Sequence, residues 1–252
     1  MNDIETFKKT GVVLLHNFFT EEEADQIVHF ANQLENWEEK PNKWMIYFEK
    51  ANTKSRIERF IDYYPELKKF METKVYPKVN TIFGKETFLF KDKLNWKQGG
   101  GKGFNAHQDH PAWSDFTPSE YITVALFAND STIQNGCLQF GRGETKFIKE
   151  CPYNKEGMGE IKPEIENKLK WDFSETTTRD LLLFDSFVPH RSYKNITDCS
   201  RRIFYFTFND QKEGDLYKEY FVNKRTYFPP DIERTESVSI TNNKYNLANP
   251  IV

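Results

Sequence analysis

Cysteine is scarce in this chain of 252 residues: it occurs three times, at Cys137, Cys151 and Cys199, and never with CxxC spacing. This pattern argues against a zinc knuckle and against a disulfide framework. Long apolar runs are also missing, because no stretch approaches the roughly 18 residues of a membrane-spanning helix, and the short apolar run near the N-terminus is not a signal sequence. We therefore expect a cytoplasmic protein without a membrane partner.

An excess of basic residues is absent as well. Lysine and arginine number 35 against 38 acidic residues, which gives a formal net charge of −3. Because a nucleic-acid-binding surface usually shows as a basic excess, we expect no nucleic-acid partner. Aromatic residues are plentiful instead, at 16% of the chain with 23 phenylalanines. They supply enough apolar surface for the core of one large domain.

The hydrophobic period changes near residue 87. Before it, a short strand in 11–19 precedes a helix that starts at Thr20 with a capping box to Glu23, and a second helix is predicted between Pro65 and Gly84. After it, the period is two, and several runs are apolar on both parities, as expected of strands buried on both faces. The strand-like runs are 87–97, 103–109, 121–130, 136–143, 180–190 and 201–210.

This order predicts a mainly β fold, a sandwich or jelly-roll barrel buttressed by N-terminal helices. We expect a single domain over 1–252, with a helical buttress in about 1–85, a β core in about 86–210 and a C-terminal extension in 211–252. The charged, aperiodic segment 146–173 inside the core is expected to be either a lid or a surface excursion, since long loops in compact domains are of both kinds.

Two of the five histidines lie in the stretch FNAHQDHPAW. On a strand His107 and Asp109 would share one face, with Gln108 on the other. A third ligand is available in His190, at the end of the apolar run LLLFDSFVPH. Two imidazoles and one carboxylate form the facial triad that leaves three positions open on Fe(II), whereas a structural zinc site prefers four ligands and cysteine.

Arg201 follows His190 at the start of the next strand-like run, and its guanidinium suits a carboxylate held by two parallel hydrogen bonds. Ser192 shares the strand parity of His190 and adds a hydroxyl to the same anchor.

Taken together, HQD at 107–109, NGCLQF at 135–140, LLLFDSFVPHRS at 181–192 and SRRIFYFTFN at 200–209 resemble the phytanoyl-CoA dioxygenase family of Fe(II)/2-oxoglutarate oxygenases. The resemblance implies a double-stranded β-helix, a cupin-like jelly roll. It also implies that His107, Asp109 and His190 are the catalytic iron ligands, and that Arg201 and Ser192 hold the co-substrate 2-oxoglutarate. Because Asp109 is present, hydroxylation is favoured over halogenation, with O2 consumed and succinate and CO2 released.

The strand before HxD resembles the family's co-substrate strand, so we expect Lys93 and Asn95, together with Gln108, beside 2-oxoglutarate. Trp113, His110, Lys97 and Arg142 are the candidate substrate contacts; Arg142 stands where the family usually has a Pro-Gly-Ser-His turn. The cations in this set favour a small anionic or zwitterionic metabolite, such as a phosphonate or an amino acid.

Two other classes remain open from the residues themselves. A non-catalytic β-sandwich binding module would carry the HxD pair incidentally. A zinc hydrolase using the same three ligands would need a general base beside the metal-bound water, for which His110 and Glu120 are the candidates.

Overall fold

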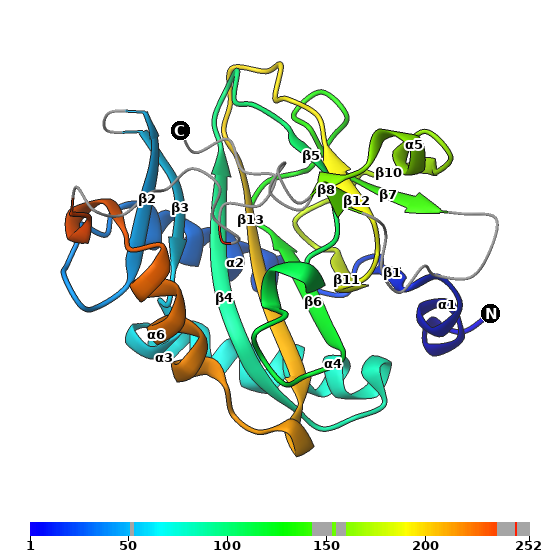
Figure 1. Ribbon diagram of the computed structural model, residues 1–252, viewed down its shortest axis with the longest axis horizontal. Helices are drawn as coiled ribbons and strands as arrows, with labels where there is room; N and C mark the ends of the chain where they lie inside the picture. Colours follow the sequence, from blue (N-terminus) through cyan, green and yellow to red (C-terminus); the bar gives the residue numbers. More distant parts are fainter. Residues whose placement is uncertain (51–52, 143–152, 155–159, 236–244, 246–252) are drawn as a thin grey trace.

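The computed structural model describes residues 1–50, 53–142, 153–154, 160–235 and Tyr245, and consists of two antiparallel sheets with helices around them (Figure 1). The larger sheet has seven strands, in the order β1 (Val12–Leu15), β11 (Leu181–Asp185), β6 (Tyr121–Phe127), β13 (Arg201–Asp210), β4 (Thr87–Lys97), β3 (Thr53–Glu58) and β2 (Met45–Lys50). The smaller sheet has the order β10 (Lys170–Ser174), β7 (Leu138–Arg142), β12 (His190–Ser192), β5 (Phe104–His107), β9 (Glu160–Ile161) and β8 (Tyr153–Asn154). The predicted fold class is confirmed.

Helices lie mainly on one side of the larger sheet (Figure 1). The α-helices are α1 (Asp3–Thr10), α2 (Glu21–Glu35), α3 (Pro65–Phe70), α4 (Tyr76–Phe83), α5 (Pro163–Glu166) and α6 (Tyr217–Tyr227), and a π-helical turn, η2 (Met71–Val75), joins α3 to α4. Short 3-10 helices are η1 (Ile61–Tyr63), η3 (His110–Trp113), η4 (Gln211–Glu213) and η5 (Asp231–Glu233).

The capping box at Thr20 and the helix end at Gly84, both predicted from the sequence, are present in the structure. At the start of α2, the Glu23 backbone N–H donates to Thr20 Oγ1 at 3.2 Å, and the Thr20 N–H donates to the Glu23 carboxylate at 3.1 Å. This capping box satisfies two N–H groups that have no partner inside the helix. Gly84 ends α4 with φ +72°, a left-handed conformation that glycine adopts without a steric penalty.

The two faces of the larger sheet have different partners. Its outer face packs against α2, α3 and α4, and alternate strand residues supply the contact because side chains on a strand alternate between faces. This core includes Ile27, Phe30, Leu34, Leu67, Phe70, Val79, Ile82, Leu94, Val124, Leu126, Leu181, Leu183, Phe204 and Phe206. The inner face meets the smaller sheet through Ala125, Phe127, Leu138, Phe140, Leu182, Phe184, Val188, Ile203 and Tyr205.

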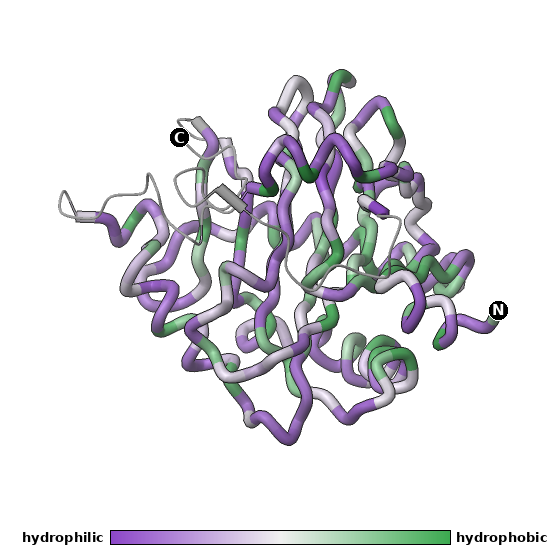
Figure 2. Tube along the Cα trace, turned by 45° about the vertical axis from the view of Figure 1, so that its right-hand side comes forward, coloured by the Kyte–Doolittle hydropathy of each residue, from purple (hydrophilic) through white to green (hydrophobic). Residues whose placement is uncertain are grey.

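Strand β4 is an exception to this apolar interior. Hydrophilic residues are not confined to the outer loops but also occur along the central strands (Figure 2). Lys91, Asn95 and Lys97 are buried on β4, at alternate positions that share the inner face. Buried polar groups of this kind are costly unless they are paired or serve a ligand. The middle of the larger sheet is therefore the place to look for a site.

Two parts of the predicted domain plan need correction. The segment 1–85 is not only a helical buttress, because β2 and β3 extend the larger sheet beyond β4. This hairpin is short and carries charges on its inner face, so it lacks the apolar alternation that marks a strand. The segment 211–252 is not a mere extension, because α6 packs beside β4 and Tyr220, Phe221 and Phe228 are buried.

The segment 146–173 is only partly a loop. Residues 146–152 and 155–159 lie outside the described residues. The remainder joins the smaller sheet: β10 pairs with β7 along its whole length, and Glu160 of β9 pairs with His107 of β5. Among the helices that the structure describes, none has the length and apolarity to cross a bilayer.

The fold predicts a clear difference between two aliphatic truncations. Leu183 is fully buried in β11 between β1 and β6, so Leu183→Ala should lower the free energy of unfolding by about 2–5 kcal/mol. Val222 is 65% exposed on α6, and Val222→Ala should change it by less than about 0.5 kcal/mol. Urea denaturation followed by tryptophan fluorescence measures both. Equal stabilities for the two variants would contradict this description of the core.

Candidate active site

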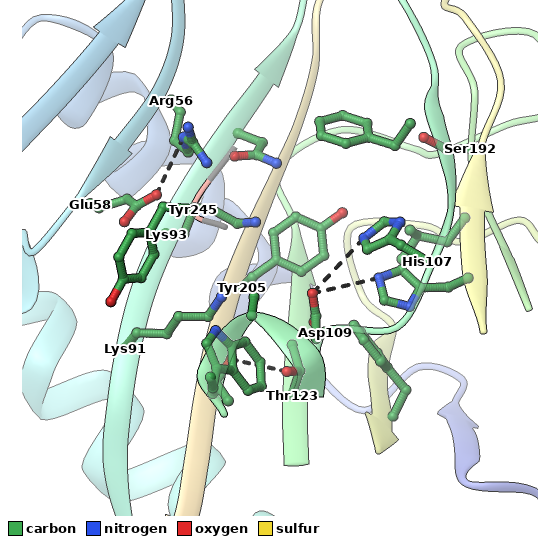
Figure 3. Close-up of a pocket in the computed structure, with 18 of the residues that line it drawn as sticks. Arg56, Glu58, Lys91, Lys93, His107, Asp109, Thr123, Ser192, Tyr205 and Tyr245 are labelled. Carbon is green, nitrogen blue, oxygen red and sulfur yellow. Dashed lines mark hydrogen bonds and ion pairs between the residues drawn. The ribbon is translucent and has the colours of Figure 1, made fainter. Parts of the chain in front are cut away.

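Three side chains from two neighbouring strands and a turn converge between the sheets. His107 ends β5 and His190 begins β12, and the two residues are direct partners in the antiparallel register. Their ring centroids lie 4.2 Å apart. Asp109 Oδ1 lies 3.9 Å from Nε2 of each ring (Figure 3). One ligand atom from each residue falls within 4.8 Å of the others.

His107 and Asp109 lie close together as predicted, but the structural reason given for this proximity was wrong. Alternation along one strand does not bring them together, because β5 ends at His107 and Asp109 has helical backbone angles at the start of η3. The chain turns after His107, and this turn aims the Asp109 carboxylate back toward the two rings. The strand predicted from the sequence extended to Asp109, two residues beyond the end of β5 at His107.

Backbone hydrogen bonds orient both imidazoles. His107 Nδ1 lies 2.7 Å from the carbonyl oxygen of Asn105, and His190 Nδ1 lies 2.9 Å from that of Val188. Because a carbonyl only accepts, each Nδ1 carries the hydrogen and each Nε2 is left with a lone pair. Metal-binding histidines are fixed in this way, with the second nitrogen bonded to a carbonyl or carboxylate.

The electrostatics also suit a cation. Burial, together with neighbouring His190, lowers the pKa of His107 to about 3, which keeps its imidazole neutral. Burial would raise the pKa of Asp109, but His190 and Lys91 outweigh it and hold this pKa at about 2. Two imidazoles and one ionised carboxylate are the donor set of a divalent iron site with open positions. The residues therefore fit the metal that the sequence motif predicts.

A cavity opens beside this triad and is lined by residues of both sheets, of η3 and of α6. The inner face of the larger sheet forms its floor, where strand register fixes the neighbours. Lys91 of β4 pairs with Thr207 of β13, and Lys93 pairs with Tyr205. Further along, Asn95 pairs with Ile203 and Lys97 with Arg201. Lys91, Lys93 and Asn95 thus form a polar row along the cavity, and Lys97, a predicted substrate contact, continues the row outside the cavity lining.

Arg201 and Ser192 meet at one end of this row. Arg201 is fully buried and donates to the carbonyl oxygen of Gly136. Lys97 Nζ donates to Ser192 Oγ at 2.7 Å and also contacts the Gly136 carbonyl at 3.3 Å. Gly136 has φ +76°, and an added Cβ would lie 2.3 Å from the Tyr193 carbonyl oxygen. The glycine of the NGCLQF motif thus allows the turn that receives Arg201.

The other end of the cavity was missed by sequence reasoning. Arg56 and Glu58, on the inner face of β3, lie 3.3 Å apart between Nε and Oε1 and point into the cavity (Figure 3). Lys224 of α6 forms a buried ion pair with Glu58. Lys91 and Tyr245 complete this end. Arg56 and Glu58 are two residues apart, so they share one face of a strand. This spacing would have predicted a charged pair only if β3 had been recognised as a strand.

Four further predicted residues were candidate contacts around the triad. Trp113 lines the cavity from η3. Three others lie outside its lining: the Gln108 side-chain amide donates to the Phe187 carbonyl, the His110 ring stacks on Phe187 with centroids 4.0 Å apart, and exposed Arg142 pairs with Asp172. Gln108 and His110 lie on the face of the chain that meets Phe187, and Arg142 lies at the end of β7, so none of the three lines the cavity.

These features define a class of protein: a two-sheet β sandwich with a His-Asp-His cluster at a cavity between the sheets. The sequence model of phytanoyl-CoA dioxygenase (PhyH) matches residues 7–203, and the chain belongs to this family.

Curated relatives match over nearly the whole chain. The 2-aminoethylphosphonate dioxygenase of uncultured bacterium HF130_AEPn_1 is 39% identical, over 97% of this chain and 95% of the relative. The methylphosphonate hydroxylase of Gimesia maris is 29% identical, over 90% of this chain and 87% of the relative.

Solved structures share the fold. EctD from S. alaskensis, crystallised with 2-oxoglutarate and 5-hydroxyectoine, superposes with a TM-score of 0.70 at 17% identity, over 83% of this chain and 76% of that one. The non-heme alpha ketoglutarate dependent epimerase SnoN superposes with a TM-score of 0.68 at 15% identity, over 82% and 81%. The protein is a 2-oxoglutarate-dependent non-haem iron dioxygenase.

The geometry predicts that iron binding depends on Asp109 and not on His110. Asp109→Ala removes one of three donors and should weaken Fe(II) binding by roughly 100-fold or more. His110→Ala should bind Fe(II) as the unmodified protein does, because its ring stacks on Phe187 away from the cavity. Anaerobic equilibrium dialysis with Fe(II) measures both. Unchanged binding by Asp109→Ala would exclude Asp109 as a ligand.

Proposed function

We propose that the protein oxidises a C–H bond of a small phosphonate, most simply an aminoalkylphosphonate, with Fe(II) held by His107, Asp109 and His190. The observation that carries the proposal is the excess of cationic side chains at the cavity. Full-length similarity to a 2-aminoethylphosphonate dioxygenase and a methylphosphonate hydroxylase supports the same substrate class.

The charge count of the cavity favours anionic ligands. Two carboxylates line it, Glu58 and Asp109. The cations of the lining outnumber them, even when Arg191 is set aside because it pairs with Glu166 at 2.6 Å. The other five are Arg56, Lys91, Lys93, Arg201 and Lys224. Two dianionic groups, a phosphonate and 2-oxoglutarate, would neutralise most of this charge, whereas a neutral substrate would leave more of the buried cations uncompensated.

Arg201 and Ser192 are proposed to hold the far carboxylate of 2-oxoglutarate. The guanidinium is buried, and the nearby Lys97 donates to Ser192. Burial, and then the Arg201 charge, lowers the pKa of Lys97 to about 6. A carboxylate at this end would therefore be held chiefly by the fork of Arg201, which does not lose its charge near neutral pH.

Fe(II) with 2-oxoglutarate supplies the activation of O2 and the oxidising power. The chain positions the reactants and restricts water. Phe184, Leu138 and Tyr205 line the cavity around the triad and provide apolar surface. Cations on the floor orient an anionic group and leave its carbon chain directed toward the triad. Since Asp109 occupies the third ligand position, hydroxylation is proposed in preference to halogenation.

The alternative of a zinc hydrolase loses its general base. Glu120 is paired with Lys85 at 2.7 Å, and neither Glu120 nor His110 lines the cavity formed by the described residues. A binding module without catalysis is disfavoured by family membership.

A cytoplasmic location is also proposed. Cys137 is buried and Cys199 exposed, and both are free thiols, as is usual in reducing compartments. Subcellular fractionation of the source cells, with the protein detected by antibody, tests this.

The anchor role predicts a sharp difference between neighbouring arginines. Arg201→Lys should raise the Kd for 2-oxoglutarate roughly 10- to 100-fold while Fe(II) stays bound, because a point charge does not replace the bidentate fork. Arg202 lies on the opposite face, against Asn129 and Glu35, so Arg202→Lys should leave this Kd unchanged. Anaerobic titration of the absorption band of the Fe(II)–2-oxoglutarate complex gives both values. Equal affinities would place the anchor elsewhere.

The substrate class predicts which compounds couple O2 use to product. Succinate release should rise at least about tenfold above the uncoupled rate with 2-aminoethylphosphonate or methylphosphonate, because a phosphonate carries up to two negative charges and suits the cationic cavity better than a carboxylate does. The carboxylate counterpart 3-aminopropanoate should give little stimulation. Succinate assay and mass spectrometry of the phosphonate, looking for one added oxygen, measure the outcome. Stimulation by the carboxylate alone would refute the phosphonate assignment.

A further inference from the structure

We infer that Lys91 and Lys93 bind the phosphonate group of the substrate, at the end of the cavity opposite Arg201. This inference rests on the proposed function and adds to it the residues that select the substrate. It assigns Lys93 to the substrate, whereas the sequence resemblance placed this residue beside 2-oxoglutarate. In Figure 3 both lysines lie on one side of the pocket with Arg56 and Glu58, while His107, Asp109 and Ser192 lie on the other, with Tyr205 between.

Strand geometry separates the two anion-binding ends. Lys91, Lys93 and Lys97 share the inner face of β4, and Lys97 is the register partner of Arg201. At roughly 3.3 Å per residue, the backbone of Lys93 is about 13 Å and that of Lys91 about 20 Å from the row that holds Arg201. One small dicarboxylate bound by Arg201 does not need these lysines. They are available to a second anion.

Aromatic rings hold the two lysines in place. Lys91 Nζ lies 4.3 Å from the ring centroid of Trp113, and Lys93 Nζ lies 5.0 Å from that of Tyr205. A cation–π contact orients an ammonium group and does not occupy all three of its N–H donors, so donors remain for a ligand. Trp113 follows Asp109 in η3, and Tyr205 lies on the floor beside the triad. The same contacts hold both ammonium groups at the cavity, which all four residues line.

Neither lysine forms a salt bridge with a carboxylate in the part of the chain that the structure describes. Glu58, although the register partner of Lys93, forms its ion pairs with Lys224 and Arg56. Burial, in each case the largest effect, lowers the pKa of both Lys91 and Lys93. The charges of Asp109 and Glu58 favour the protonated lysines but do not offset the effect of burial, and a dianion between the two ammonium groups removes that cost.

Glu58 has a positioning role in this arrangement. Burial would raise its pKa, but Lys224 and Arg56 outweigh it and hold this pKa at about 2, so the carboxylate is ionised. It thereby fixes Lys224 of α6 and Arg56 of β3 at the edge of the site.

The two lysines also distinguish a phosphonate from a carboxylate. A phosphonate has three oxygens and up to two negative charges, so it can accept hydrogen bonds from two ammonium groups. A carboxylate on the same carbon chain has two oxygens and one charge, and uses fewer donors.

Calorimetric titration of 2-aminoethylphosphonate and of 3-aminopropanoate tests the inference, with protein loaded anaerobically with Fe(II) and 2-oxoglutarate. The unmodified protein should bind the phosphonate at least about tenfold more tightly than the carboxylate. Lys91→Met and Lys93→Met, which keep the length of the side chain and remove its charge, should each raise the Kd for the phosphonate at least about tenfold. Their Kd for 2-oxoglutarate should stay within about threefold of the unmodified value.

Lys54→Met is the matched control. This lysine lies on β3, and its Nζ donates to the Glu35 and Trp37 carbonyls at 2.6 Å each, outside the cavity. Its phosphonate affinity should be unchanged. Lys91→Arg and Lys93→Arg should recover part of the affinity, and an unchanged 2-oxoglutarate Kd confirms that each variant is folded.

The outcomes separate the inference from the proposed function. If the unmodified protein binds and oxidises the phosphonate and both methionine variants bind it equally well, the assignment of Lys91 and Lys93 is overturned while the function stands. If the methionine variants lose 2-oxoglutarate instead, the lysines belong to the co-substrate and the assignment is again overturned. If the unmodified protein binds neither 2-aminoethylphosphonate nor methylphosphonate, the proposed function fails and the inference with it.

Discussion

The antiparallel pairing of β4 with β13 is the constraint on which the site depends. Both strands lie in the middle of the larger sheet, and their register runs from Thr87 opposite Asp210 to Lys97 opposite Arg201. A shift by one residue would move every inner side chain to the helix-covered face. The same pairing that buries Phe204 and Phe206 against the helices therefore presents Tyr205 and Arg201 to the cavity.

The cost of this arrangement is a floor of buried charge. Apolar side chains at the same positions would stabilise the fold more, because ion pairs in a protein interior seldom repay their desolvation in full. The outer face provides compensation: its aromatic and aliphatic residues pack against α2, α3 and α4 with almost no exposure. One sheet thus combines a face that stabilises the fold with a face that serves ligands.

The smaller sheet contributes the two histidines of the His-Asp-His cluster and lines the cavity. His107 and His190 are register partners, and backbone carbonyls fix their tautomers, so the orientation of the imidazoles follows from strand pairing and local backbone. Asp109 joins them because the chain leaves the strand immediately after His107. Helix α6 and Tyr245 complete the opposite end, which makes the C-terminal part of the chain a component of the pocket.

Much was predictable from the sequence because the signals are local. The capping box at Thr20, the left-handed stop at Gly84 and the doubly buried strands around Val124 and Phe204 depend on neighbours within a few residues. The identity of the triad also followed, since its residue types and order carry the family resemblance.

The positions of Arg56, Glu58 and Lys224 were decided only by the tertiary structure. They come from β3 and α6, 166 residues apart at the Glu58–Lys224 pair, and only the pairing of β3 with β4 and the packing of α6 bring them to the cavity. From the sequence alone, a charged residue in a short polar strand cannot be distinguished from a solvent-exposed residue, because its burial depends on the neighbouring strand. Local pattern therefore determined the elements and the residue types of the His-Asp-His cluster, while long-range register and packing decided which charged side chains line the cavity.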